Sequence, residues 1–178
     1  MSPTDILNLG LVVVPVLFAV IFLIFEIYVV IIGHIKGAPY VRSSRKKIDA
    51  MITMAEIRPG EVVIDLGSGD GSLLIESAKK GARVIGIDIN PFLCAYARWR
   101  IRRNGLAKRI TVICGDFRNY PLKDADIVFV YLWPETLALL KNKFIQELKP
   151  GARIVSNAFR IPELHEIKKQ NGVFCYIV

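Results

Sequence analysis

The sequence predicts an α/β protein with a doubly wound, mostly parallel sheet that ends in an antiparallel hairpin, preceded by one transmembrane helix. Short β-branched runs alternate with helical patterns after residue 48. A glycine-rich turn joins the first of these runs to a helix. An uncharged stretch of 20 residues, 6–25, lies near the N-terminus. With 178 residues, the chain suits one domain of ordinary size and is too short for two separate cores.

The N-terminal stretch is predicted to be an uncleaved membrane anchor. It is long enough to span a bilayer as a helix, and it is apolar on every face, unlike an interfacial helix. A cleavable signal peptide has a basic start and a shorter apolar core, whereas only Asp5 is charged before this run. We expect the anchor over residues 1–33, with lipid contacts through residues 9–33. Glu26 either pairs with a partner helix or is protonated and tolerated.

A basic linker, residues 34–47, is predicted to follow the anchor. No Lys or Arg precedes the apolar stretch, so the positive-inside rule places the N-terminus outside and the rest of the chain in the cytoplasm. The basic cluster would contact anionic headgroups, which accounts for part of the net charge of +8 without nucleic acid. The cluster consists of Lys36, Arg42, Arg45, Lys46 and Lys47.

The predicted helices of the remaining domain, residues 48–178, follow from apolar spacing and from start and stop signals. Apolar residues at intervals of three and four predict a helix from Ile48, which Pro59-Gly60 ends. Asn90 followed by Pro91 is typical of a helix start. The later helices are predicted at 72–80, 91–103 and 135–148.

The predicted strands are short, apolar and β-branched, and they alternate with these helices, which favours a parallel sheet. Asn171-Gly172 lies between the last two strand-like runs and is a strong signal for an antiparallel hairpin. The strands are predicted at 62–66, 83–89, 110–114, 127–132, 153–156, 166–169 and 173–178.

Three segments with glycine or aspartate lie at the predicted carboxyl ends of neighbouring strands. The first strand runs into DLGSGDG, residues 65–71, whose glycines allow a tight turn and close approach of a ligand. Their spacing is GxGxG, not the GxGxxG of dinucleotide-binding proteins. Asp88 ends the second strand, where an acid can bind two ribose hydroxyls, and Asp116 follows the third. Together they indicate a ligand crevice at this edge of the sheet.

No metal site or disulfide framework is predicted. The three cysteines are scattered and form no CxxC pair, and the two histidines are far apart in the sequence.

The segments DLGSGDG, GIDIN and GDF resemble the motifs of class I S-adenosylmethionine-dependent methyltransferases, and the resemblance covers residues 48–178. It implies a Rossmann-like sheet of seven strands and S-adenosyl-L-methionine as the cofactor. It further implies cofactor contacts from the turn, with Asp65 orienting it, from the ribose-binding acid, and from the residues around the adenine. These residues are Asp65, Gly67, Ser68, Gly69, Gly71, Asp88, Ile89, Asp116 and Phe117.

A narrower resemblance is to the small lysine methyltransferases that modify the ATP synthase c-subunit and the adenine nucleotide translocase, and to their archaeal relatives. It rests on the anchor, on PYV at residues 39–41 and on the VSxxF pattern at residues 155–159. The family pattern PYVPTP reads PYVRSS here, so Ser43 keeps a hydroxyl where the family has Thr and both later prolines are absent. The resemblance implies that Tyr40 and Ser43 contribute to the cofactor site and that the acceptor is a protein lysine near or in the membrane.

The acceptor site is predicted directly after the fourth strand. Methyl transfer is an in-line displacement that requires a positioned and neutral lysine amine. Tyr131 and Trp133 can wall a narrow channel and attract a cationic side chain. Glu135 either orients the amine or is only a dipole partner at a helix start.

Three alternative functions remain open at this point. An RNA methyltransferase is indicated by the basic stripe at residues 98–109 with Trp99 within it, although a solvated face on a basic, membrane-apposed protein is the simpler explanation of the stripe. No NPPY-type motif follows the fourth strand. A quinone or lipid substrate would suit the anchor. A cofactor-binding membrane module without turnover is disfavoured by the intact turn and both acids.

Overall fold

The computed structural model describes residues 11–24, 26 and 41–178, and its contacts divide the chain into two units, Met1–Pro39 and Tyr40–Val178. In the first unit, residues 11–24 form a helix whose side chains are exposed. Residues 1–10, 25 and 27–33 of the predicted anchor lie outside the described residues. No helix within the described part of the chain has the length and apolar character needed to cross a membrane.

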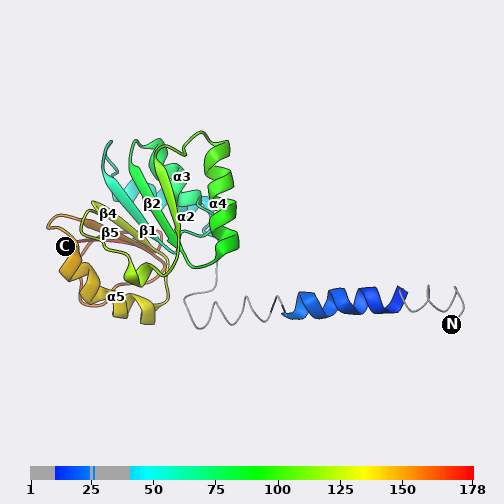
Figure 1. Ribbon diagram of the computed structural model, residues 1–178. Helices are drawn as coiled ribbons and strands as arrows, with labels where there is room; N and C mark the ends of the chain where they lie inside the picture. The colour runs from blue at the N-terminus through cyan, green and yellow to red at the C-terminus, as the bar shows by residue number, and fades with distance from the viewer. Residues whose placement is uncertain (1–10, 25, 27–40) are drawn as a thin grey trace, which may run out of the picture. The chain divides into compact units, whose positions relative to one another are not determined.

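The second unit is built on one seven-stranded sheet, which confirms the predicted α/β fold (Figure 1). The strand order is β3-β2-β1-β4-β5-β7-β6. The first five strands pair in parallel and the last two pair antiparallel to their neighbours, so the predicted C-terminal hairpin is also confirmed. The strands are β1 Val62–Leu66, β2 Arg83–Asp88, β3 Ile110–Cys114, β4 Ile127–Val130, β5 Arg153–Asn157, β6 Glu166–Gln170 and β7 Val173–Ile177.

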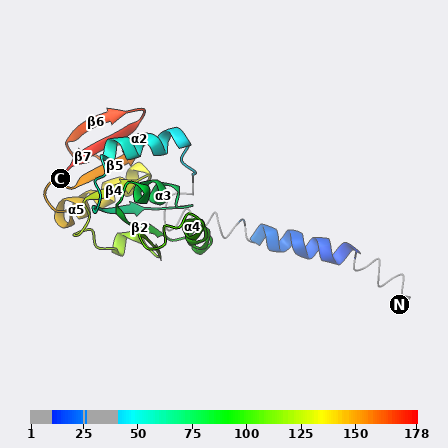
Figure 2. The ribbon, with the colours of Figure 1, turned by 90° about the horizontal axis from the view of Figure 1, so that it is seen from above.

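Helices pack on both faces of this sheet (Figures 1 and 2). Buried side chains of α2, α3 and α4 form one core with residues of the central strands. Buried side chains of α5 and of the short 3-10 helix η1 form a second core on the opposite face. A parallel sheet buried on both faces explains why its strands read as continuous apolar runs. The helices are α2 Arg45–Ala55, α3 Ser72–Lys79, α4 Pro91–Arg103, η1 Phe117–Asn119 and α5 Pro134–Glu147.

Side-chain caps set where two of these helices begin. Asn90 accepts hydrogen bonds from the backbone N–H groups of Phe92 and Leu93, at 2.9 and 3.3 Å, as the sequence predicts. Helix α2 begins at Arg45, three residues before the predicted start, because the hydroxyl of Ser44 caps it. The last three residues of the predicted linker are therefore helical.

The Asn171-Gly172 turn places the hairpin beside the end of β5. Both turn residues adopt left-handed backbone angles, φ 52° and 69°, which a tight hairpin requires. The N–H of Ala158 donates to the carbonyl of Gly172 at 2.8 Å, and the Lys47 ammonium donates to the carbonyl of Asn171. The turn thus joins the start of α2 to the segment that follows β5.

The carboxyl ends of the parallel strands lie level with one another. Leu66 in β1 pairs with Ile87 in β2 and with Val130 in β4, and Val130 pairs with Ser156 in β5. The chain leaves β1 toward α3 and leaves β4 toward α5, on opposite faces of the sheet. This divergence at neighbouring strands opens a crevice, the usual ligand site of such sheets.

Gly86 in β2 is needed for this edge to form. A Cβ at this position would lie 2.5 Å from Cδ1 of Leu74 and 2.8 Å from Cβ of Ser68. Leu74 is fully buried and Ser68 belongs to the glycine-rich turn, so neither side chain has room to withdraw.

We predict that Gly86→Ala lowers the free energy of unfolding by about 1–3 kcal/mol, because overpacking forces shifts in neighbouring side chains and backbone. Gly115→Ala is the matched control, since a Cβ there meets nothing within 4 Å. Urea unfolding of both variants measures the difference. Equal free energies of unfolding for the two variants would show that the glycine-rich turn shifts to make room for the added Cβ without a loss of stability.

Candidate active site

The turn between β1 and α3 folds back against the end of β2. Gly67, Gly69 and Gly71 adopt φ angles of 85°, 53° and 74°, which side chains disfavour. The N–H groups of Gly67 and Ser68 both donate to the carbonyl of Ile87, at 2.8 and 3.0 Å. The turn therefore presents a backbone surface without side chains at the carboxyl edge.

Asp88 connects this turn to the start of α4. One carboxylate oxygen accepts the N–H of Gly69 and the other accepts the N–H of Asn90, both at 2.8 Å. The side chain is 8% exposed, and burial raises its pKa while these hydrogen bonds oppose the rise. Each oxygen keeps a further acceptor position, which suits a pair of ligand hydroxyls.

Two further acids surround the turn, and they differ in their partners. Asp70 forms ion pairs with Arg100 at 2.7 Å and Arg42 at 3.5 Å. Asp65 is buried, and no cation pairs with it among the described residues. Burial, and then the charges of Asp88 and Asp70, raise the pKa of Asp65 to about 8. Asp65 therefore holds a proton at neutral pH, and a cation bound beside it would favour the ionised form.

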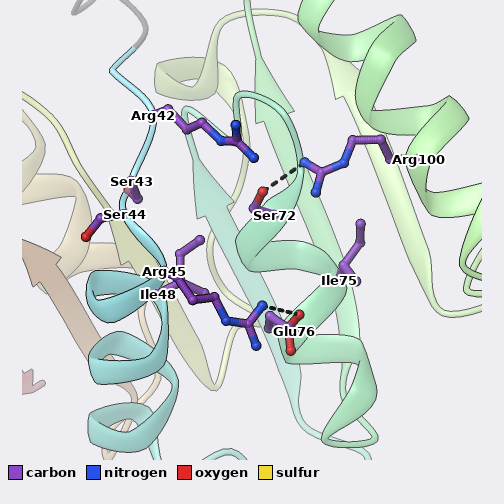
Figure 3. Close-up of a pocket in the computed structure, with 9 residues that line it drawn as sticks. All are labelled: Arg42, Ser43, Ser44, Arg45, Ile48, Ser72, Ile75, Glu76 and Arg100. Carbon is purple, nitrogen blue, oxygen red and sulfur yellow. Dashed lines mark hydrogen bonds and ion pairs between the residues drawn. The ribbon is translucent and has the colours of Figure 1, made fainter.

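A cavity of about 380 Å³ adjoins the turn (Figure 3). Arg100 donates to the hydroxyl of Ser72 and to the carbonyl of Asp70, both at 2.8 Å, and Arg45 pairs with Glu76 at 3.0 Å. The first residue of α2 is therefore held to α3 by charge. Ser43 lines this cavity, and Tyr40 lies outside the described residues. The lining residues are Arg42, Ser43, Ser44, Arg45, Ile48, Ser72, Ile75, Glu76 and Arg100.

The predicted adenine-side residues lie at the ends of β2 and β3. The N–H of Gly115 donates to the carbonyl of Asp88 at 2.9 Å, so the segment that carries Asp116 is held to the predicted ribose-binding acid. Asp116 caps η1 and pairs with Arg118 at 2.5 Å. Ile89 is half-buried, whereas Phe117 is buried in the core beneath the edge.

The predicted acceptor residues lie where β4 passes into α5. Tyr131 is half-buried, and Glu135 is exposed in the first turn of α5. Trp133 is 50% exposed and stacks on Phe159, with ring centroids 6.4 Å apart and planes 16° apart. The hydroxyl of Ser156 donates to the carbonyl of Phe159 at 2.6 Å, which fixes this aromatic partner. The structure therefore adds Phe159 to the predicted acceptor wall.

Asn157 at the end of β5 was not predicted as a site residue. Val130 at the end of β4 pairs with Ser156, so Asn157 follows in β5 at the edge where Tyr131 follows β4. It is 2% exposed, and its Oδ1 atom has no donor in the described part of the chain, as is also true of the hydroxyl of Ser68. The one feature of the sequence that could have indicated a site residue here is an amide side chain at the end of a buried strand. Two unsatisfied polar atoms at this edge fit a polar ligand.

The residues present suit S-adenosylmethionine. The acids match its ammonium and sulfonium charges, Asp88 has acceptor positions for its ribose hydroxyls, and the glycine turn admits close approach. No cluster of metal-ligating side chains occurs among the residues that the structure describes. Fold and site together define a class I S-adenosylmethionine-dependent methyltransferase.

Comparison with known proteins specifies the family. Residues 65–168 match the model of the ANTKMT methyltransferase domain, and the chain belongs to that family. A protein-lysine N-methyltransferase of Saccharolobus islandicus is 32% identical over 131 residues, which cover 72% of this chain and 81% of that protein. The adenine nucleotide translocase lysine N-methyltransferase of Mus musculus is 36% identical over 125 residues, which cover 70% of this chain and 54% of the mouse protein.

A similar solved structure holds the product of the cofactor. It is an RNA methyltransferase from Salinibacter ruber in complex with S-adenosyl-L-homocysteine, with a TM-score of 0.72 and 30% identity. The match covers 77% of this chain and 92% of that one. The chain spans about half the length of the mouse relative, so its substrate and partners are not transferred from that protein.

The raised pKa of Asp65 predicts a pH-dependent stability. The folded protein holds this proton up to about pH 8, whereas the ordinary carboxyl pKa is 3.8, so stability falls as pH rises between these values. We predict that Asp65→Asn raises the melting temperature of the unliganded protein at pH 8, by an amount worth at least about 1 kcal/mol, and that the gain shrinks toward pH 4.

Thermal melting across this range measures the effect. Asp124→Asn removes an exposed carboxylate and serves as the control, which should follow the wild-type curve. Parallel curves for wild type and Asp65→Asn would contradict the assignment of the buried proton.

Proposed function

We propose that this chain transfers the methyl group of S-adenosylmethionine to a lysine of a protein close to a membrane. The observation that carries the proposal is the stacked pair of Trp133 and Phe159, at the edge of the sheet where β4 and β5 end, in a chain of this family. The relatives support a lysine acceptor, since they include a protein-lysine N-methyltransferase and lysine N-methyltransferases named for the adenine nucleotide translocase and for the ATP synthase c-subunit.

The protein forms no covalent bond in this reaction, because the methyl group passes directly from the cofactor to the lysine nitrogen. The cofactor supplies an electrophilic methyl group, the lysine nitrogen forms the new N–C bond as the C–S bond breaks, and the nitrogen's proton goes to solvent. The chain positions the amine in line and removes water from it. Tyr131 and Trp133 attract the cationic side chain through their ring faces, and partial burial lowers the pKa of its ammonium.

Asn157 supports a positioned amine. Among the described residues no donor reaches its buried Oδ1, and an amine N–H would satisfy this atom without adding negative charge. A neutral acceptor orients the amine but favours the ammonium less than a carboxylate would. The unsatisfied carboxamide thus suits a substrate that must lose a proton before it reacts.

Membrane anchoring is the second part of the proposal. It is supported by the uncharged run at residues 6–25 and by the basic residues that follow it. Residues 34–44 precede α2 and reach at most about 40 Å when fully extended. The active site would therefore sample a shell close to the bilayer, where the effective concentration of membrane-bound substrates is high. The proposed topology places the N-terminus outside and the methyltransferase domain in the cytoplasm.

We predict that Tyr131→Ala or Trp133→Ala lowers methyl transfer at least about tenfold while cofactor affinity changes little, because the aromatic wall receives the acceptor. Leu139→Ala on the exposed side of α5 is the control. Radiolabelled methyl transfer into membrane extracts and calorimetry with the cofactor separate the two effects.

The label also identifies the acceptor class. Mass spectrometry should find methyl-lysine on one or a few membrane proteins, lost in cells without the gene. A label in RNA, quinone or lipid, with lysine methylation unchanged, would disprove the lysine acceptor but not the methyltransferase class.

Alkaline carbonate extraction tests the anchor. We predict that the full chain stays in the membrane pellet and that protease added outside sealed vesicles trims only the N-terminal tail, because the apolar run holds the chain and the basic flank stays inside. Release by carbonate would show that the chain is only peripherally bound.

A further inference from the structure

The solvent-facing side of α4 carries aromatic rings. Phe92, Tyr96, Trp99 and Arg103 recur at intervals of four, three and four residues, so they follow one face of the helix. The buried residues Cys94, Ala97 and Ile101 lie on the opposite face. Phe92, Tyr96 and Trp99 are 61%, 49% and 48% exposed. We call Phe92, Tyr96, Trp99 and Arg103 the α4 outer face.

The rings on this face are already ordered. Tyr96 and Trp99 stack with centroids 5.6 Å apart and planes 21° apart. The Arg103 guanidinium lies 5.1 Å from the centroid of Trp99, and the Arg100 guanidinium lies 5.8 Å from that of Tyr96. Contiguous exposed aromatic rings mark an interaction site more often than single ones do.

The charged residues around this face are all basic. Residues 91–115 contain no Asp or Glu. Arg98, Arg100 and Arg109 donate to backbone carbonyls of the domain. In contrast, Arg102, Arg103 and Lys108 are exposed and form no ion pair within the described part of the chain. The basic residues of this segment are Arg98, Arg100, Arg102, Arg103, Lys108 and Arg109.

We propose that the α4 outer face docks the methyltransferase domain on an anionic bilayer surface. Aromatic rings with arginines beside them are the side chains that occupy the interface between headgroups and acyl chains. Each basic residue near an anionic leaflet contributes about 1 kcal/mol, and no acid in residues 91–115 opposes that attraction. The apolar half of the helix is already buried in the domain, so the docking depends on the rings and on charge.

The arrangement of the rings disfavours nucleic acid as the occupant. Single-stranded nucleic acid binds such surfaces by stacking bases on open aromatic faces. Here Tyr96 and Trp99 stack on each other, and Arg103 covers the Trp99 ring. The interfacial layer of a bilayer accepts the apolar edges of the rings and the guanidinium groups together, so the packed rings suit a bilayer better than nucleic acid.

The contact gives the domain a defined orientation. Helix α4 begins directly after Asp88, at the carboxyl edge of the sheet, so docking along α4 brings the cofactor crevice to the bilayer surface. This inference rests on the proposed membrane anchor, which brings the domain to the surface in the first place. It adds a second attachment that depends on lipid charge.

The two tryptophans, Trp99 and Trp133, allow a direct test in the full chain. In the Trp133→Phe variant Trp99 is the only tryptophan, and in Trp99→Phe only Trp133 remains. Both variants are reconstituted into phosphatidylcholine vesicles with and without phosphatidylserine, using lipids brominated in the acyl chains as quenchers. We expect Trp99 fluorescence to fall about twofold or more in anionic vesicles and less in neutral ones, while Trp133 is quenched less than Trp99 because it does not lie on the α4 outer face.

Charge reversal tests the cause. Arg102→Glu with Arg103→Glu, in the Trp133→Phe background, should abolish most of the quenching. Lys123→Glu with Lys169→Glu makes the same charge change at exposed sites, before β4 and in β6 at the far end of the strand order from β3, and should preserve the quenching.

Three outcomes overturn the proposal. Protein that floats with the vesicles but shows no quenching of Trp99 overturns the docking and leaves the anchor. Protein that does not float overturns both. Quenching of Trp99 by an RNA oligonucleotide bearing a quencher, in place of lipid, would assign the face to nucleic acid. None of these readouts depends on methyl transfer, so they stand apart from the proposed lysine activity.

Discussion

The carboxylate of Asp88 is the constraint on which the site depends. It accepts the N–H of Gly69 and the N–H of Asn90, so one side chain fixes both the glycine-rich turn and the start of α4. A buried carboxylate is costly unless it is hydrogen-bonded, and the turn supplies those bonds only in its folded form. The cofactor crevice is therefore shaped by a group that also has acceptor positions left for a ligand.

Arg100 extends this network across the face that carries α2, α3 and α4. Its side chain extends from α4 and contacts the carboxylate and carbonyl of Asp70 and the hydroxyl of Ser72. Arg42, in the segment before α2, forms an ion pair with the same Asp70 carboxylate. Asp70 thus joins the glycine-rich turn, α4 and the segment that leads into α2. Contacts made by α4 therefore reach the turn through Asp70 as well as through Asp88, and contacts made by the segment before α2 reach it through Asp70.

The sequence predicted the features that depend on local pattern, such as the strand and helix alternation and the Asn171-Gly172 hairpin. It did not predict contacts that depend on how the strands are ordered. Phe159 entered the sequence analysis only as part of the VSxxF pattern, and its contact with Trp133 exists because β4 and β5 lie side by side. The start of α2 shows a different limit. Ser44 caps the helix and makes Arg45 its first residue, although three consecutive cations there read as a linker. The ion pair of Arg45 with Glu76 compensates the charge that made a helix seem unfavourable, and Glu76 is distant in the sequence.

The electrostatics of the two halves of the site are opposite, and the reaction needs both. The cofactor half gathers the carboxylates of Asp70 and Asp88, which suit a ligand that carries positive charge throughout binding, and the buried Asp65, which is protonated below about pH 8 in the unliganded protein. A lysine must instead lose its charge before it attacks. A carboxylate beside it would stabilise the ammonium and raise its pKa, whereas ring faces attract the side chain more weakly and desolvation lowers the pKa. Glu135 is exposed to solvent, where its field is screened, and the groups at the acceptor side of the edge are Tyr131, Trp133, Phe159 and the neutral amide of Asn157. The site therefore holds the methyl donor by charge and the methyl acceptor largely without it.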